Sequence, residues 1–305
     1  AYEIMPSLVG SEMCIRDRFE KVLIANRGEI ALRLHRACRE MGIRTVAVHS
    51  TADADAMHVR LADEAVCIGP PSAIESYLNI PTILAAAEIT GSDGIHPGYG
   101  FLSENADFAQ IVEEHGYTFI GPSEQHIKIM GDKIQAKKTI RELGIKVVPG
   151  SDDAILDPEE AKALADDMGY PVLIKAASGG GGRGMKVVHQ ASEIKTSLEA
   201  ARTECKAAFN DDAVYIEKYL KNPRHIEVQI MGDGTGKVIH LGERDCSLQR
   251  RNQKVLEEAP SPALNAGTRA NIGQLVVDAL SKIKYKSLGT VEFLYEDGVF
   301  FFIEM

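Results

Sequence analysis

A run of glycines in the middle of the chain is the first feature whose residue types could do chemistry. Residues 178–184 read Ser-Gly-Gly-Gly-Gly-Arg-Gly and lie between two strand-like segments. Consecutive glycines expose backbone N–H groups and allow positive φ angles, so such a loop can wrap phosphate oxygens. No Gly-Lys-Ser/Thr follows into a helix, which excludes a Walker A loop. We therefore expect a phosphate-binding flap with the Lys175 ammonium beside it, and a plain flexible hairpin loop is the alternative.

Two glutamates near the C-terminal end have the spacing of a divalent-metal site. Glu292 and Glu304 lie on two apolar segments that are separated by residues 296–298, Glu-Asp-Gly. A three-residue loop there would pair Tyr295 with Val299 and would put both carboxylates on one face of a hairpin. The opposite face, made of the odd-numbered residues, would then be wholly apolar. Such a carboxylate pair suits Mg²⁺ on nucleotide phosphates, and a solvated sheet face is the alternative.

Other candidate constellations are less specific. A basic cluster around residues 246–253 could hold an anion or could be a solvated run of charge. The first strand–helix turn has only Gly28 of a G-x-G-x-x-G pattern, so we do not expect a nicotinamide site. The histidines show no metal-ligand spacing, and no G-x-S-x-G element is present. The cations of the basic cluster are Arg244, Arg250, Arg251 and Lys254.

Composition excludes several classes of protein. The chain has 305 residues, of which 45% are hydrophobic, and its net charge is −10. That acidic balance argues against non-specific nucleic-acid binding, which needs an excess of Lys and Arg. No run of 18 apolar residues predicts a membrane span. The five cysteines form no CxxC pair, so a reducing compartment, the cytoplasm, is expected.

The segments that must position these residues alternate between strands and helices. Residues 19–121 have the alternation of an open, mostly parallel sheet, which predicts a first α/β domain. Residues 122–147 read as a helical connector with a break at Gly131. Residues 148–218 form a second unit that contains the glycine run, and residues 219–305 are rich in strands.

The two ends of the sequence differ from the rest. Residues 1–18 show no periodicity and lack the apolar region of a signal peptide, so we expect an unrelated, disordered leader. The sequence stops at Met305 inside a segment that reads as a strand, VFFFIEM. We therefore expect a fragment of a longer protein.

Taken together, these motifs resemble the biotin carboxylase family of ATP-grasp enzymes. The resemblance covers residues 19–305, and it implies an α/β and α+β fold: a Rossmann-like N-terminal domain followed by an ATP-grasp domain with a glycine-rich flap. Residues 148–218 would then be the small lid subdomain and residues 219–305 the large subdomain. The matching stretches are HPGYGFLSENA (96–106), FIGPS (119–123), MGDK (130–133), IKAASGGGGRGMKVV (174–188), EKYL (217–220), PRHIEVQI (223–230), ERDCSLQRRNQKVLEEAP (243–260) and FIEM (302–305).

The resemblance implies a set of site residues. Glu292 and Glu304 would bind Mg²⁺, for which Mn²⁺ can substitute, and Lys254 would be catalytic by holding bicarbonate or carboxyphosphate. Tyr99 would lie on a loop near the biotin pocket. The implied ATP contacts are Lys133, Lys175, Gly180, Gly181, Gly182, Gly184, Met185, Glu217, Lys218, Leu220, His225 and Gln249.

The resemblance also implies an activity. ATP and bicarbonate would give carboxyphosphate, and its CO₂ would pass to biotin on a biotin carboxyl carrier protein, with carboxyltransferase subunits as further partners and a homodimer as the assembly. Acetyl-CoA carboxylase of fatty-acid synthesis is the favoured context. The alternatives are a propionyl-CoA, methylcrotonyl-CoA or pyruvate carboxylase module, another ATP-grasp ligase, or a chain that only binds nucleotide.

Two departures from the family pattern bear on this activity. In the family, FIEM is followed by Asn-x-Arg-x-Gln-Val-Glu-His, which carries a metal ligand, the bicarbonate-binding Arg and the general base; this sequence ends at FIEM. The 305 residues are therefore expected to bind Mg-ATP without carboxylating biotin. Asn252 stands where many members have His, which is read as variation between subtypes.

Overall fold

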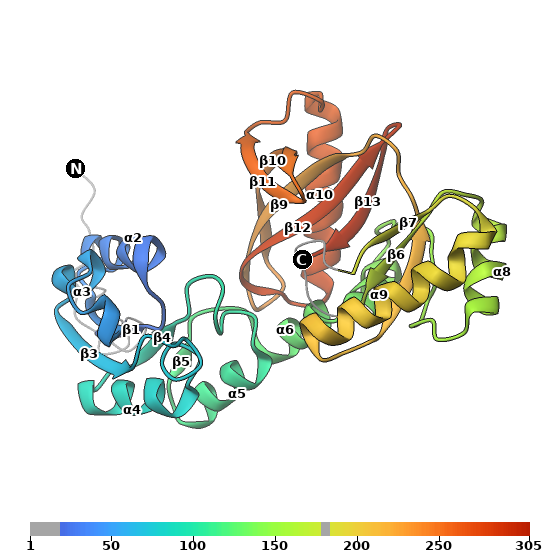
Figure 1. Ribbon diagram of the computed structural model, residues 1–305. Coiled ribbons are helices and arrows are strands. Elements are labelled where there is room, and N and C mark those ends of the chain that lie inside the picture. Colours follow the sequence, from blue (N-terminus) through green and yellow to red (C-terminus); the bar gives the residue numbers. More distant parts are fainter. Residues whose placement is uncertain (1–18, 178–183) are drawn as a thin grey trace, which may run out of the picture. The chain divides into compact units, whose positions relative to one another are not determined.

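The computed structural model describes residues 19–177 and 184–305. The chain divides after Glu124 into two compact units, here called unit 1 and unit 2. Figure 1 labels the helices and strands of the two units. Among the described residues, no helix combines the length and the apolar character that crossing a bilayer requires.

Unit 1 is built on a five-stranded sheet in the order β3-β2-β1-β4-β5, and every pairing is parallel. This confirms the predicted α/β class. All four residues of β1 are buried, as expected of a central parallel strand covered on both faces. The strands are β1 (Lys21–Ile24), β2 (Arg44–Ser50), β3 (Glu64–Gly69), β4 (Gly94–His96) and β5 (Thr118–Phe119). The helices are α2 (Gly28–Glu40), α3 (Met57–Leu61), α4 (Ile80–Thr90), α5 (Ala106–Glu114) and the 3₁₀ turn η2 (Thr51–Asp53).

The connector between the sheets consists of two helices, α6 (Glu124–Gly131) and α7 (Lys133–Glu142). The predicted break at Gly131 is present. Asp132 begins the second helix, because its side chain accepts a hydrogen bond from the Gln135 N–H at 2.9 Å. This cap fixes where the first turn of α7 starts.

A three-stranded antiparallel sheet in the order β7-β6-β8 carries the glycine run between β6 and β7. Two helices, α8 and α9, pack their apolar residues on this sheet. The apolar stripe of α9 is buried at Ile194, Leu198, Ala201 and Cys205, whereas Ala208 is exposed. The elements are α8 (Pro158–Met168), β6 (Val172–Ala176), β7 (Lys186–Val188), η3 (Ala191–Glu193), α9 (Ile194–Phe209) and β8 (Val214–Lys218).

A five-stranded antiparallel sheet in the order β11-β10-β9-β12-β13 completes unit 2. One face packs on α10, where Val276 and Leu280 of the helix meet Val228 and Ile230 of the sheet in one buried cluster. The other face is therefore left to carry polar side chains. The elements are β9 (Arg224–Asp233), β10 (Val238–Arg250), β11 (Gln253–Glu258), α10 (Ala266–Lys282), β12 (Lys286–Glu296) and β13 (Val299–Glu304).

The β12–β13 hairpin differs from its prediction. The loop has two residues, Asp297 and Gly298, with φ angles of +50° and +80°, and Glu296 pairs with Val299. Such a turn matches the twist of the strands better than the three-residue loop that we expected.

The shorter turn changes which side chains of β13 face the core. Phe300 and Phe302 contact the buried Phe293 edge-on, so the predicted odd-numbered face is wrong for this strand. A register shift between Glu292 and Phe293 then leaves Glu292 opposite Glu304. The expected pairing of the two carboxylates is present, and an irregularity in the ladder produces it.

Candidate nucleotide and metal site

The polar face of the five-stranded sheet carries one row of charges across four neighbouring strands. Arg244 of β10 is paired with Glu227 of β9, Glu227 with Glu292 of β12, and Glu292 with Glu304 of β13. Antiparallel register places directly opposite side chains on the same face. The row therefore brings three carboxylates and one guanidinium together from distant parts of the chain.

Two cations and one histidine contact the middle of this row. The Lys254 ammonium donates to Glu292 at 2.9 Å and also to Glu227. The Arg244 guanidinium donates to Glu227 at 2.8 Å, and His225 contacts Glu292 at 2.7 Å. Burial raises the pKa of Glu292, but the hydrogen bonds from His225 and Lys254 outweigh it and hold the pKa at about 2. Glu292 is therefore ionised at neutral pH.

Hydrogen bonding sets the tautomer of His225. The Gln249 amide donates through Nε2 to His225 Nδ1 at 2.9 Å, so Nδ1 is an acceptor. The ring proton then lies on Nε2 and points at Glu292. Gln249 also donates to the Cys246 carbonyl at 2.9 Å, which fixes the amide. Gln249 and His225, which were both predicted to contact ATP, thus form a chain of hydrogen bonds that ends at Glu292 of the acidic row.

The two carboxylates of this group, Glu227 and Glu292, suit a hard divalent cation, whereas both nitrogens of His225 are already in hydrogen bonds. Ligand atoms of His225, Glu227 and Glu292 all lie within 4.8 Å of one another. Carboxylate oxygens are the ligands that Mg²⁺ prefers, and the Lys254 ammonium bridges two of them. Glu304, the predicted second ligand, is outside this group and pairs instead with Lys133 of α7 at 3.3 Å.

A second charged centre lies at the end of β8. The Glu217 side chain is only 2% exposed, and each of its oxygens receives one lysine: Lys137 at 2.6 Å and Lys175 at 2.7 Å. Burial raises the pKa of Glu217, but the two ammonium groups lower it more, so the net shift is downward. The group is a buried carboxylate with two buried or half-buried cations, and it carries one excess positive charge.

A cavity of about 430 Å³ opens beside this centre. Its size lies within the usual range for small-molecule sites, and apolar side chains are mixed with charged ones. Among the described residues, the Leu220 N–H has no backbone partner and is free to meet a flat heterocycle. The lining residues are Val148, Leu173, Lys175, Met185, Val187, Glu217, Lys218, Tyr219, Leu220, Lys221, Pro223, Asn252 and Leu294.

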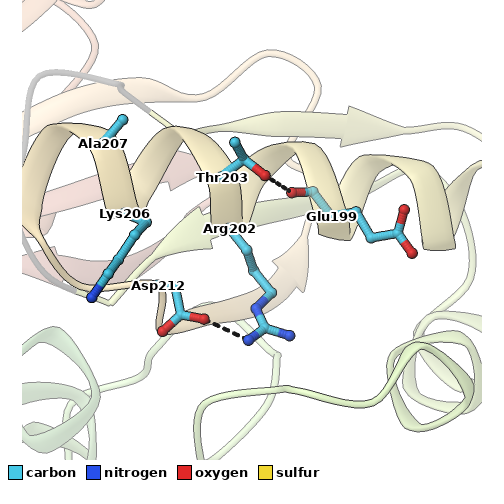
Figure 2. Close-up of a pocket in the computed structure, with 6 residues that line it drawn as sticks. All are labelled: Glu199, Arg202, Thr203, Lys206, Ala207 and Asp212. Carbon is cyan, nitrogen blue, oxygen red and sulfur yellow. Dashed lines mark hydrogen bonds and ion pairs between the residues drawn. The ribbon is translucent and has the colours of Figure 1, made fainter.

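A larger hollow of about 610 Å³ lies along α9 and does not have this chemistry (Figure 2). Two of its cations are held by local groups, because Arg202 donates to Asp212 and Lys206 donates to the Asn210 carbonyl at 3.0 Å, and Thr203 donates to the Glu199 carbonyl at 2.8 Å. The smaller cavity, with Lys175 and Glu217 in its wall, is therefore the candidate site.

Several predicted residues do not converge on the cavity through their side chains. The Lys218 ammonium turns away and donates to the Gly169 carbonyl at 2.7 Å, so only its backbone can serve the cavity. Gly184 is described, with a φ of +72°, whereas Gly180, Gly181 and Gly182 lie outside the described residues.

Tyr99 and the basic cluster are the remaining predicted residues. Tyr99 belongs to unit 1, where the residue is 63% exposed and its carbonyl accepts from Asn26 at 2.8 Å. Of the basic cluster, Arg244 and Lys254 meet at Glu227, while Arg250 and Arg251 lie exposed at the β10–β11 turn.

Two residues of the site were missed by the sequence reasoning. Glu227 lies two residues after His225 in β9. Since side chains of a strand alternate between its faces, this spacing could have placed Glu227 on the same face as His225. Lys137 stands one helical turn after Lys133 in α7, so the two share a face of the helix. Their partners come from other strands, and sequence spacing alone cannot supply those.

Comparison with known proteins shows the family. The model "Biotin carboxylase, N-terminal domain" matches residues 18–127. The model "Carbamoyl-phosphate synthase L chain, ATP binding domain" matches residues 132–305. Together the two models account for nearly all of the described chain.

The chain is also similar to proteins that carry this name. Biotin carboxylase of Pseudomonas aeruginosa is 59% identical over 287 residues, which is 94% of this chain and 64% of the relative. The chain thus spans less than two thirds of the length of that curated relative.

Solved structures of biotin carboxylases are also similar to this chain. A biotin carboxylase from Campylobacter jejuni, in a β-γ-ATP complex, superposes with a TM-score of 0.92 at 49% identity, covering 95% of this chain and 66% of that one. The biotin carboxylase domain of Hydrogenobacter thermophilus 2-oxoglutarate carboxylase, a dimer with MgADP, ADP and bicarbonate, superposes with a TM-score of 0.90 at 50% identity, covering 94% and 63%. These matches, together with the parallel N-terminal sheet and the antiparallel sheets of unit 2, show that the chain belongs to the biotin carboxylase family of ATP-grasp proteins.

Proposed function

We propose that this chain carries the nucleotide-handling part of a biotin carboxylase, an ATP-dependent carbon–nitrogen ligase. In the proposed reaction, bicarbonate attacks the γ-phosphate of ATP to give carboxyphosphate and ADP. Carboxyphosphate then releases CO₂ and phosphate, and CO₂ is taken up by the N1′ of biotin on a carrier protein. The observation that carries the proposal is the buried Glu217 with Lys137 and Lys175 at the wall of the 430 Å³ cavity.

The residues of the site have distinct parts in this proposal. The adenine lies in the cavity against Leu220, and the phosphates extend toward Lys175 and Lys133, whose charges offset theirs. Positioning and charge neutralisation supply most of the catalysis in phosphoryl transfer. Mg²⁺ held by the acidic row would neutralise the phosphate oxygens further. Lys254 lies between Glu227 and Glu292, and it would hold bicarbonate beside them.

The wider context is part of the same proposal. We assign the chain to an acetyl-CoA carboxylase of fatty-acid synthesis in the cytoplasm, acting as a homodimer with carrier and carboxyltransferase partners. The similarity to relatives that carry the plain name biotin carboxylase supports a separate biotin carboxylase subunit, and the dimer of the Hydrogenobacter domain, which is part of a 2-oxoglutarate carboxylase, supports the homodimer alone. The four described cysteines are free thiols, which fits a reducing compartment.

The first test is nucleotide binding by the 305-residue chain. Isothermal titration should show Mg-ATP binding, and Lys175→Ala should weaken it about 10- to 100-fold, because a charge-assisted hydrogen bond to phosphate is lost. Lys162→Ala is the matched control, since Lys162 is an exposed lysine on α8. Equal ATP affinity in all three proteins would remove the assignment of this cavity.

The second test is turnover. Labelled bicarbonate, ATP, Mg²⁺ and free biotin are incubated with the chain, and carboxybiotin and phosphate are measured. ATP binding without product would favour the alternative that these 305 residues only bind nucleotide. Bicarbonate-dependent phosphate release with labelled biotin would establish the ligase activity.

A further inference from the structure

The two lysines on Glu217 differ in their access to the cavity. The Lys175 side chain is 17% exposed and lines the cavity, whereas the Lys137 side chain is 4% exposed and is not among the described lining residues. The Lys137 ammonium is further fixed at 5.0 Å from the centre of the Tyr215 ring. One cation of the pair is thus free to turn toward a ligand, and the other is held in the protein.

This asymmetry matters because a buried carboxylate cannot be left without a partner. If Lys175 moves from Glu217 to a phosphate, the carboxylate loses one of its two ion pairs. An uncompensated buried charge costs several kcal/mol, enough to oppose the movement. With Lys137 in place at 2.6 Å, Glu217 keeps one full counter-charge throughout.

The net charge of the group gives the same result. Two ammonium groups and one carboxylate leave one excess positive charge facing the cavity. Without Lys137 the group would be neutral, and Lys175 would be the only counter-ion of Glu217. The phosphates of a nucleotide would then have to compete with Glu217 for Lys175.

We propose that Lys137 is a positioning residue: it holds Glu217 and so keeps Lys175 available to the phosphates of a nucleotide. The inference rests on the proposed nucleotide site but goes beyond it, because Lys137 itself contacts no nucleotide. It assigns to Lys137 an effect on phosphate recognition and none on recognition of the base.

The experiment compares ATP with adenosine. Isothermal titration measures both ligands against the wild-type chain and Lys137→Met. We expect ATP affinity to fall about 10- to 100-fold, as for loss of a charge-assisted contact, while adenosine affinity stays within about twofold. Lys138→Met is the matched control, because the neighbouring Lys138 pairs with the exposed Asp153. Parallel losses for both ligands would show a merely structural role and would overturn the proposal.

A second variant tests the direction of the coupling. In Lys137→Met/Glu217→Gln the neutral amide no longer retains Lys175, so ATP affinity should recover relative to Lys137→Met. Affinity that stays the same or falls further in the double variant contradicts the proposal.

Two further outcomes are distinguishable. If Lys137→Met does not fold, Glu217→Gln is compared with the double variant. Because the amide no longer retains Lys175, removing Lys137 should then cost less than about tenfold in ATP affinity, and a loss of about tenfold or more overturns the proposal. If the wild-type chain itself does not bind ATP, the proposed function fails. If it binds ATP and Lys137→Met binds equally well, only the role of Lys137 fails.

Discussion

At the scale of single residues, Glu292 is the member of the acidic row that lies between Lys254 and His225. It faces Lys254 at 2.9 Å and His225 at 2.7 Å, and its pKa of about 2 keeps it ionised over the whole working range of pH. A carboxylate held in this way suits a metal ligand, because protons do not compete with the cation.

We therefore predict that Glu292→Gln raises the Mg²⁺ concentration needed for half-maximal ATP binding. The substitution keeps shape and removes charge, and even outer partners of a metal typically contribute about 10- to 100-fold in affinity. We expect at least about a tenfold rise, measured by titrating Mg²⁺ at fixed ATP. Glu258→Gln, at an exposed position in β11, is the control. A Mg²⁺ titration that overlays the wild type would make Glu292 an ordinary sheet acid.

At the scale of elements, the β12–β13 turn decides which side chains of the hairpin reach the site. Asp297 and Gly298 have φ angles of +50° and +80°, and a Cβ at Gly298 would meet nothing within 4 Å. Any cost of a side chain there is therefore backbone strain and not a clash.

We predict that Gly298→Ala lowers the free energy of unfolding of unit 2 by about 1–2 kcal/mol. Denaturant titration measures this change. Gly131→Ala is the matched control, because a Cβ there is also in open space but no positive φ is required. That control should be neutral or slightly stabilising, and equal losses at both positions would show that the turn conformation is not the cause.

At the scale of the whole molecule, a buried histidine should make the stability of unit 1 sensitive to acid. His35 of α2 is 4% exposed, and neither of its ring nitrogens has a hydrogen-bond partner among the described residues. Burial and, to a smaller extent, the neighbouring His58 lower its pKa to about 4, against the opposing effect of Asp63. The folded protein therefore favours the neutral ring.

The sign of the effect follows from this lowered pKa. Stability from neutral His35 is complete above the unfolded pKa near 6.5, and it is lost as pH falls toward 4. At pH 5 the loss is about 2 kcal/mol relative to pH 8. Hydrogen exchange of the β1 and β2 amides should accelerate accordingly at pH 5, after correction for the intrinsic rate.

His35→Leu should remove the part of that acceleration that is due to His35, because an apolar side chain does not titrate; the part due to His96, whose pKa burial also lowers to about 4, should remain. His115→Leu serves as the control, since His115 lies exposed at the end of α5. If His35→Leu and the wild type show the same pH dependence, another group is responsible.

The sequence by itself determined the features that depend on local pattern. Alternating strands and helices gave the parallel sheet of unit 1, the glycine run marked the β6–β7 connection, and Gly131 marked the break before α7. Hydrophobic periodicity and turn residues are local properties, so these elements could be predicted. The quoted motifs also identified the family, which the comparisons confirm.

Only the tertiary structure decided which side chains meet. The three-residue loop was wrong, yet Glu292 and Glu304 still face each other, because a register shift compensates for the shorter turn. Glu227 and Lys137 could not be assigned, since their partners, Glu292 and Glu217, lie 65 and 80 positions away. Strand register and helix docking set such contacts, and both depend on the packing of the whole unit rather than on neighbouring residues.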